Sequence, residues 1–319
     1  MMKQRFIAAL QNHCLSDLQM IDKSDLHNHA GRGGHIEYIE QWANVKIMPP
    51  TEPFHSLDDM QHWFDHNVKC HCPGLEGYLK RIEASFAQAR QDHIKVLSMS
   101  FGIDEIDKLG GMDPFINIVN GMRDTFSPDT AFFPELALTR ESCIDSILHR
   151  IDEILSYQWF KSIDICNNEF AQPIKHFKGV YQIAQKAGLI RKAHVGEFGS
   201  ADDVMEAVEV LELQEVHHGV AAAQSPQIMK WLANHNIQLN VCPTSNVMLR
   251  VAGSYKEHPI RTLFDNNVPV SINTDDLLIF NSTISQEYLH LYEADLMTAD
   301  ELNLIRETGL QYSYKEGFF

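Results

Sequence analysis

The chain has 319 residues, of which 44% are hydrophobic, and its formal net charge is −17. The hydrophobic fraction is ordinary for a globular protein. The excess of acidic residues argues against a nucleic-acid backbone or an anionic membrane surface as a partner, because both attract clustered lysine and arginine. A small-molecule substrate, even an anionic one that is bound locally, is still compatible with this charge.

The cysteines and the N-terminal residues favour a cytoplasmic protein. The six cysteines are scattered and form no C-x-x-C pair, as expected for reduced thiols. The apolar run near the N-terminus is shorter than the ~7–15 residues of a signal-peptide core. No stretch approaches the ~18 apolar residues that cross a membrane. We therefore expect a cytoplasmic protein, and the sequence leaves its oligomeric state open.

Short apolar, β-branched runs predict eight strands. They are Ser24–His29, Ile94–Phe101, Ala131–Leu138, Ser162–Cys166, Ile190–His194, Val216–His218, Ile237–Val241 and Val268–Ile272. Helix-period segments lie between them, namely Tyr78–Gln91, Cys143–Ser156, Gln172–Ala187, Ala201–Leu211 and Pro226–His235. Strands that alternate with helices indicate parallel βαβ units. We predict an α/β fold, a (β/α)8 TIM barrel formed by residues 1–319 as a single domain. An open doubly wound sheet is the alternative, but no G-x-G-x-x-G follows the first strand.

Two connections look longer than turns. Residues 30–80 form an insertion after the first strand, and an insertion of this length is usually functional, so we predict a lid. Its histidines and cysteines lack zinc-finger spacing and are expected to belong to an amphipathic lid segment. Residues 102–115 contain Gly110-Gly111 and Asp113-Pro114 and are predicted to form a second long loop. Helices are expected near 285–292 and 299–309.

Histidines and carboxylates follow several of the predicted strands. His27 and His29 are two residues apart, so their side chains share one face of a strand. In a barrel this face is the interior, at the C-terminal mouth where such enzymes act. Taken alone, His-x-His is equally compatible with two histidines that only form hydrogen bonds. His194 ends the fifth strand, and Glu197 follows it by three residues.

Two further stretches complete the predicted constellation. His217-His218-Gly219 ends the sixth strand, where alternation sends one histidine inward, and we select His218. Asp275 and Asp276 follow the eighth strand, although paired aspartates there are often a solvated turn or a helix cap. The joint occurrence of such groups after four different strands predicts one metal site.

The residue types favour zinc. Three imidazoles and a carboxylate, from His27, His29, His194 and Asp275, suit a borderline divalent ion. Such an ion lowers the pKa of a bound water from about 15.7 to roughly 7. His218 could orient this water and help to deprotonate it, and Glu197 could deliver a proton to the substrate.

The motifs resemble the adenosine deaminase family of the amidohydrolases. The resemblance rests on the histidine pair, His194-Val-Gly-Glu197, His218-Gly219, Cys242-Pro-Thr-Ser-Asn246 and Ser271-Ile-Asn-Thr-Asp275-Asp276. It is strongest between about Ala193 and Phe280. It implies a (β/α)8 barrel that holds one zinc ion per chain and hydrolytically replaces an exocyclic amine on a purine.

The resemblance also implies roles for single residues. His27, His29, His194 and Asp275 would bind the metal, Glu197 would protonate the ring nitrogen beside the attacked carbon, and His218 would hold the hydroxide. Asp276 would hydrogen-bond the five-membered ring of the purine. Related amidohydrolases with two metals use a modified lysine at the end of the fourth strand. The stretch from Asp164 to Glu169 contains no lysine, so one metal is expected.

The chain departs from the family where the substrate is held. The family has an acidic residue after His-x-His-Leu that helps to hold the ribose, whereas this chain has Gly31 followed by Arg32. A glycine of the family that contacts the purine corresponds to Asn167, and Leu277 replaces a proline. These changes are either neutral or mark another substrate. Arg32 could meet a phosphate or carboxylate, because a guanidinium fork fits both.

The principal prediction is zinc-dependent deamination of an aminopurine nucleoside, adenosine to inosine plus ammonia. One alternative keeps this chemistry but acts on a 5′-modified or phosphorylated nucleoside, a free base or another aminated heterocycle. A second alternative is a non-catalytic ligand-binding barrel. Glu197 argues against this last reading, because binding alone needs no proton donor.

Overall fold

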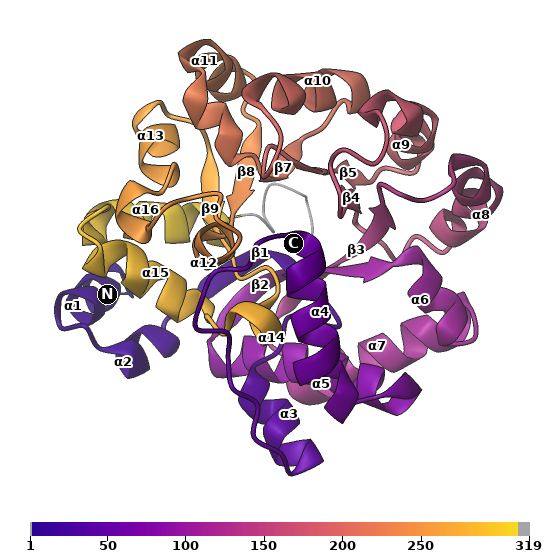
Figure 1. The fold of residues 1–319 in the computed structure, drawn as a ribbon, viewed down its shortest axis with the longest axis horizontal. Helices are drawn as coiled ribbons and strands as arrows, with labels where there is room; N and C mark the ends of the chain where they lie inside the picture. The colour runs from indigo at the N-terminus through magenta and orange to yellow at the C-terminus, as the bar shows by residue number, and fades with distance from the viewer. Residues whose placement is uncertain (1, 312–319) are drawn as a thin grey trace.

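The computed structural model describes residues 2–311 of the chain, and the strands of this part follow the predicted order. They are β1 (Lys23–His29), β2 (Ile94–Gly102), β3 (Ala131–Thr139), β4 (Ser162–Cys166), β5 (Ile190–Arg191), β6 (His194–Val195), β7 (Glu215–His218), β8 (Gln238–Val241) and β9 (Val270–Ile272). Each ladder joins strands that are consecutive in the chain, and all seven ladders are parallel. Helices surround these strands in a ring (Figure 1), as in a (β/α)8 barrel.

The strand hydrogen bonds divide into a five-stranded sheet, β1 to β5, and a four-stranded sheet, β6 to β9. At one seam, an isolated parallel bridge joins Asn28 to Asp275, and the backbone N–H of Asp275 donates to the carbonyl of His27. This contact brings the chain after β9 against the end of β1. The order of strands is therefore that of the predicted barrel, with regular pairing interrupted at two seams.

The second seam corrects the prediction of one continuous strand over Ile190–His194. The structure divides it into β5 and β6, which are separated by Lys192 and Ala193. The N–H of Lys192 still donates to the carbonyl of Ile163, and the N–H of His217 donates to the carbonyl of Ala193. The segment thus changes partner from β4 to β7 over two residues, and this change interrupts the regular ladder.

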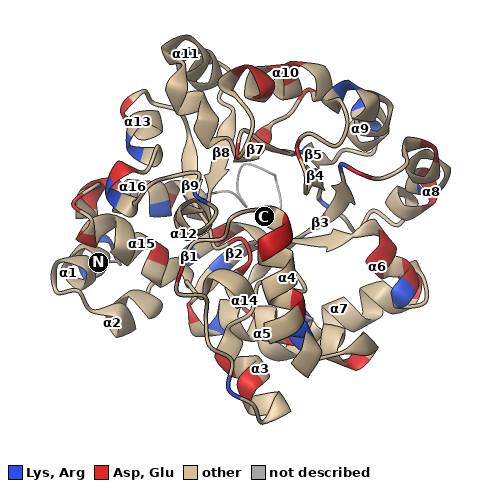
Figure 2. Cartoon of the chain, viewed as in Figure 1, with Lys and Arg blue, Asp and Glu red and all other residues tan. Residues whose placement is uncertain are grey.

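The five helices predicted between the strands are present as α5 (Gly74–Gln91), α8 (Ile144–Ser156), α9 (Lys178–Lys186), α10 (Ala201–Leu211) and α11 (Pro226–Asn234). The prediction over Gln172–Ala187 is wrong at its start, because the 3-10 helix η2 (Ile174–Phe177) precedes α9. Two short helices that were not predicted, α12 (Pro243–Met248) and α13 (Ile260–Asp265), lie on either side of residues 249–259. After β9 come α14 (Leu277–Phe280), α15 (Ile284–Glu293) and α16 (Ala299–Leu310), and α1 (Met2–Gln11) and α2 (Leu15–Gln19) precede β1. Acidic residues lie on helices around the ring, among them α3, α6 and α10 (Figure 2).

The prediction of a long loop over residues 102–115 is wrong. The structure places α6 (Ile103–Lys108) and α7 (Met112–Phe126) there. Gly110 and Gly111, with φ of 89° and 99°, form the turn between the two helices. Asp113 and Pro114 lie in the first turn of α7, where an acid is favourable and proline is tolerated. The turn residues were therefore read correctly, but they mark helix ends.

The insertion after β1 folds as α3 (Ile36–Ala43), α4 (Leu57–Asn67) and the 3-10 turn η1 (Lys69–His71), and α5 begins at Gly74. Its apolar side chains form a small core of their own. This core includes Met60 and Phe64 of α4, and it packs against Leu278 of α14 and Leu249. The insertion is thereby fixed over the part of the barrel that follows β9.

The main core lies between the strands and the surrounding helices, whereas the barrel interior is polar. Inside it, Lys192 Nζ lies 2.9 Å from Glu135 Oε2 and 3.4 Å from Glu215 Oε2. All six cysteines are free thiols. Among residues 2–311, no helix combines the length and apolarity needed to cross a membrane.

Candidate active site

The four residues predicted to bind a metal converge at one point. His27 and His29 come from β1, His194 from β6, and Asp275 from the segment after β9. One ligand atom from each of them lies within 4.8 Å of the others. His27 and Asp275 are almost fully buried, with 2% and 6% exposure. The barrel topology therefore assembles this set from residues up to 248 positions apart, the separation of His27 and Asp275 in the sequence.

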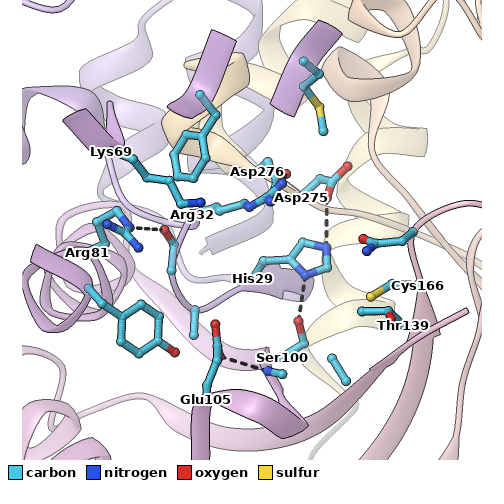
Figure 3. A pocket seen from close by; sticks show the side chains of 18 of the residues that line it. His29, Arg32, Lys69, Arg81, Ser100, Glu105, Thr139, Cys166, Asp275 and Asp276 are labelled. Carbon is cyan, nitrogen blue, oxygen red and sulfur yellow. Dashed lines mark hydrogen bonds and ion pairs between the residues drawn. The ribbon is translucent and has the colours of Figure 1, made fainter. Parts of the chain in front are cut away.

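Each of the three histidines has a polar neighbour at its outer ring nitrogen, Nδ1. The neighbours of Nδ1 are the Asn240 carbonyl for His27 at 3.3 Å, Ser100 Oγ for His29 at 2.7 Å, and Asp164 Oδ2 for His194 at 2.8 Å. Figure 3 shows His29 between Ser100 and Asp275. This arrangement leaves Nε2 of each ring free to coordinate, which is the usual way in which neighbouring groups orient histidine ligands.

Asp275 is oriented in the same manner. Ser245 Oγ donates to its Oδ2 at 2.7 Å, and its Oδ1 lies 3.1 Å from His29 Nε2. Three imidazoles and one carboxylate form a donor set typical of zinc. The residues present therefore fit a divalent metal ion.

Several chain turns at the site adopt left-handed backbone conformations. Asn167, Gly196, His218 and Asp275 have φ of 71°, 68°, 62° and 61°. Residues other than glycine seldom adopt this conformation, and asparagine tolerates it best. This explains how Asn167 occupies a position where the resembled family has glycine. Asn167 lines the cavity next to the metal-binding set.

His218 reaches the site for a different reason from the one predicted. Strand alternation was expected to send one of His217 and His218 inward. His217 already points into the barrel, where its Nε2 lies 3.0 Å from Glu135 Oε1 and its ring lies 3.9 Å from that of His27. The left-handed turn at His218 then brings the second imidazole to the site as well, with Nε2 3.6 Å from Glu197 Oε1.

Glu197 lies beside this set in a buried position. Burial, and then the negative charges of Asp275, Glu169 and Asp276, raise the pKa of Glu197 well above its usual value. Its Oε1 atom has no hydrogen-bond partner within the described residues. A protonated carboxyl group that faces a cavity can act as a proton donor.

Glu169 holds the loop that carries Glu197. Its Oε2 accepts from Gly196 N at 2.8 Å, and its Oε1 accepts from Glu197 N at 2.9 Å and from Phe198 N at 2.7 Å. Three successive N–H groups that enclose one anion form a nest. Here the anion is a side chain of the protein, 5% exposed, and it fixes the backbone at the proton donor.

The predicted substrate-binding residues line one cavity of about 740 Å³. Arg32 Nη1 donates to Asp276 Oδ2 at 2.7 Å, and its guanidinium also donates to Gln61 and lies 5.0 Å from the ring centre of Phe64. Gln61 and Phe64 of α4 thus hold Arg32 at the cavity, and Figure 3 shows it beside Asp276. The other carboxylate oxygen, Asp276 Oδ1, is buried and has no hydrogen-bond partner among the described residues.

At the position after His29 where the family has an acidic residue, a neighbouring side chain crowds Gly31. A Cβ atom at Gly31 would lie 3.1 Å from Tyr78 Cε2, so Tyr78 of α5 occupies the space beside it. The Gly31 carbonyl also accepts from Arg81 Nε at 2.9 Å. An aspartate could not be placed there without moving Tyr78.

Sequence reasoning missed several residues that contact the predicted ones. They are Asp164, Glu169, Ser245, Asn246 and His258. Ser245 and Asn246 lie in the Cys242–Asn246 motif, which could have indicated them. Asp164 and Glu169 flank the end of β4, where charged residues are expected near a barrel mouth. No local pattern marks His258.

The chain is similar to known proteins over most of its length. The adenosine deaminase family profile matches residues 140–316. A protein of Treponema pallidum named "Putative adenosine/adenine deaminase" is 29% identical over 86% of this chain and 93% of its own length.

Two solved structures share the fold. An adenine deaminase from Arthrobacter aurescens aligns with a TM-score of 0.78 and 21% identity, covering 93% of this chain and 94% of that one. An amidohydrolase from Burkholderia ambifaria, with bound Zn, aligns with a TM-score of 0.72 and 20% identity, covering 92% and 86%.

These matches confirm the predicted fold class and favour an enzyme over a ligand-binding barrel. The family profile covers more than half of the chain and includes Glu197, His218 and Asp275. The chain therefore belongs to the adenosine deaminase family of the amidohydrolase superfamily and is a hydrolytic deaminase.

Proposed function

We propose that this protein removes the exocyclic amine of an aminopurine by hydrolysis, with one zinc ion held by His27, His29, His194 and Asp275. The observation that carries the proposal is the convergence of these four ligands with a buried, protonatable Glu197 at one cavity. When bound, the metal would act as a Lewis acid and supply a water of lowered pKa.

The side chains around this point have complementary tasks. Glu197 donates a proton to the ring nitrogen beside the attacked carbon, which lets that carbon accept the oxygen. His218 Nε2, 3.6 Å from Glu197 Oε1 and 3.8 Å from Asp275 Oδ2, lies where it can contact the attacking oxygen. Asp276 offers its free Oδ1 to the five-membered ring of the purine.

The insertion takes the role of a lid in this proposal. Leu57, Met60 and Phe64 of α4 line the cavity, and Phe64 packs on Arg32. These apolar side chains exclude water from a bound base, which strengthens the interactions of Glu197 and Asp276 with it. A single domain that acts in the cytoplasm, where its six free cysteines would stay reduced, completes the proposal.

Adenosine is the principal candidate substrate, because the cavity of about 740 Å³ has room for a base and a sugar. A specific observation favours the free base, adenine, as the second candidate. The acid that holds the ribose is replaced by Gly31, and Tyr78 lies so near that a side chain there would displace it. The structure from Arthrobacter aurescens is that of an adenine deaminase, and the name of the Treponema pallidum protein includes adenine, which supports this second candidate.

Ammonia release by the zinc-loaded protein tests both candidates. The panel contains adenosine, deoxyadenosine, adenine, AMP, 5′-methylthioadenosine and a few non-purine amines. Turnover of adenosine above the rest supports the principal candidate, and turnover of adenine alone supports the second. Absence of turnover for every aminopurine in the panel, with zinc bound, would refute the proposal.

Arg32→Ala separates the candidates further. Arg32 pairs with Asp276. If Arg32 recognises a phosphate or carboxylate, Arg32→Ala lowers kcat/KM for AMP more than for adenosine. Equal kcat/KM for plain and phosphorylated nucleosides, unchanged by the substitution, would show that Arg32 does not recognise an anion.

A further inference from the structure

His218 is linked to a buried chain of hydrogen bonds that leads away from the cavity. Its Nδ1 lies 3.2 Å from Asn246 Nδ2, and Asn246 Oδ1 lies 3.2 Å from His258 Nε2. The chain ends at the backbone N–H of Ile260, which donates to His258 Nδ1 at 3.1 Å. All three side chains are at most 2% exposed, so water does not compete for these bonds.

The backbone N–H of Ile260 determines which atom donates and which accepts in every hydrogen bond from His258 to His218. An amide N–H can only donate, and Ile260 opens α13, where no helical carbonyl is available to it. His258 Nδ1 must therefore accept. Burial lowers the pKa of His258 to about 3, so this ring is neutral and carries its single proton on Nε2.

The same logic passes through the amide to His218. Because His258 Nε2–H donates, Asn246 must present its oxygen to His258 and its NH2 group to His218. The reversed amide would place an NH2 donor against an N–H donor and would lose both bonds. His218 Nδ1 therefore accepts from Asn246 and carries no proton, so the ring proton lies on Nε2, which faces Glu197 and Asp275.

We infer that Asn246 and His258 are positioning residues that present His218 to the reaction as an Nε2–H donor. In this form His218 has no lone pair toward the cavity, so it donates a hydrogen bond to the attacking oxygen and does not remove its proton. This role rests on the proposed deamination, whereas the position of the ring proton does not. It replaces the sequence-based expectation that His218 helps to deprotonate the water.

The position of the proton is measured by NMR on the full-length, zinc-loaded protein labelled with [15N]histidine. Two-bond correlations from the ring C–H protons distinguish protonated from unprotonated ring nitrogens. The signals of His218 are assigned by their loss in His218→Gln. We expect an unprotonated Nδ1 and a protonated Nε2 in both His218 and His258. A protonated Nδ1 in wild-type His218 would overturn the inference.

Asn246→Asp replaces the NH2 donor that faces His218 with an accepting oxygen and hardly changes the shape of the side chain. A carboxylate accepts from both neighbours, so the His218 proton should move to Nδ1. Removal of one preorganised donor lowers kcat by about 10²–10³-fold in well-studied enzymes. We expect a kcat loss of this order, with KM changed less than about threefold and with the zinc content of wild type. An Asn246→Asp protein that folds and keeps the wild-type His218 proton position would overturn the inference.

The two readouts separate this inference from the proposed function. A wild-type protein with the expected His218 proton position but no turnover of any aminopurine would leave the hydrogen-bond chain intact and refute the function. Turnover of an aminopurine by a wild-type protein whose His218 carries its proton on Nδ1 would support the function and refute the hydrogen-bond chain. If Asn246→Asp fails to fold, the wild-type spectrum alone decides.

Discussion

Glu169→Gln tests how much of the activity depends on the loop that carries Glu197. The carboxylate of Glu169 accepts three backbone hydrogen bonds, of 2.7 to 2.9 Å, from residues 196–198. The glutamine side chain has nearly the same shape but only one accepting oxygen. If this oxygen serves Glu197 and Phe198, the new NH2 group faces the N–H of Gly196, and that bond is lost.

The size of the effect follows from these contacts. A hydrogen bond to a charged group contributes about 1.5–3 kcal/mol, and one between neutral groups contributes about 0.5–1.5 kcal/mol. Glu169→Gln loses one bond of the first kind and weakens two, so the loop loses about 3 kcal/mol of stabilisation. If this energy holds Glu197 in place for the transition state, kcat/KM falls by about 10²-fold, since 1.36 kcal/mol corresponds to tenfold.

The assay is steady-state ammonia release, with zinc content measured on the same samples. Zinc should stay bound, because Asp164 holds His194 independently of Glu169. The charge of Glu169 contributes to the raised pKa of Glu197, so its removal should also move the alkaline limb of the kcat/KM profile to lower pH.

Glu141→Gln is the matched control. Glu141 is exposed and accepts one backbone hydrogen bond, from Asn168 N at 3.2 Å, in the neighbouring loop. The activity of Glu141→Gln should stay within about twofold of wild type, because water competes for the partners of an exposed hydrogen bond. A folded Glu169→Gln protein with activity equal to that of this control would refute the reasoning.

Three further predictions concern stability and the metal. His258 has a pKa of about 3 in the folded protein, below its unfolded value of 6.5, so folding stability is lost as pH falls below 6.5. Between pH 7 and pH 5, the free energy of unfolding of wild type should fall by about 2 kcal/mol more than that of His258→Gln, at ~1.4 kcal/mol per pH unit. Urea unfolding at the two pH values measures this difference. Asp164→Asn should weaken zinc affinity about 10–100-fold in a chelator competition, because Asp164 orients His194; unchanged affinity would contradict this role. Gly196→Ala should lower the free energy of unfolding by about 2–4 kcal/mol, because φ is +68° and the new Cβ would lie 2.3 Å from Val204 Cγ2; wild-type stability would show that the loop can relax.

The sequence determined the fold class and the identities of the metal-competent residues. Apolar runs of strand length mark the strand ends, and in a barrel of parallel strands all these ends lie at one mouth. His27, His194 and Asp275 each follow such a run, so their convergence could be predicted without coordinates. Turn residues were equally visible in residues 102–115, but Gly-Gly and Asp-Pro mark helix ends as well as loops, and the short apolar repeat of α6 was too weak to decide.

Only the tertiary structure decided how the site residues are held. The Arg32–Asp276 pair, the contact of Glu169 with residues 196–198 and the chain from His218 to His258 join segments that are distant in sequence. Such bonds depend on side-chain direction and on left-handed turns such as that at His218, neither of which leaves a periodic pattern in the sequence. Hydrophobic periodicity reports which face of an element is buried, whereas the protonation and orientation of a catalytic group depend on the few atoms that it meets after folding.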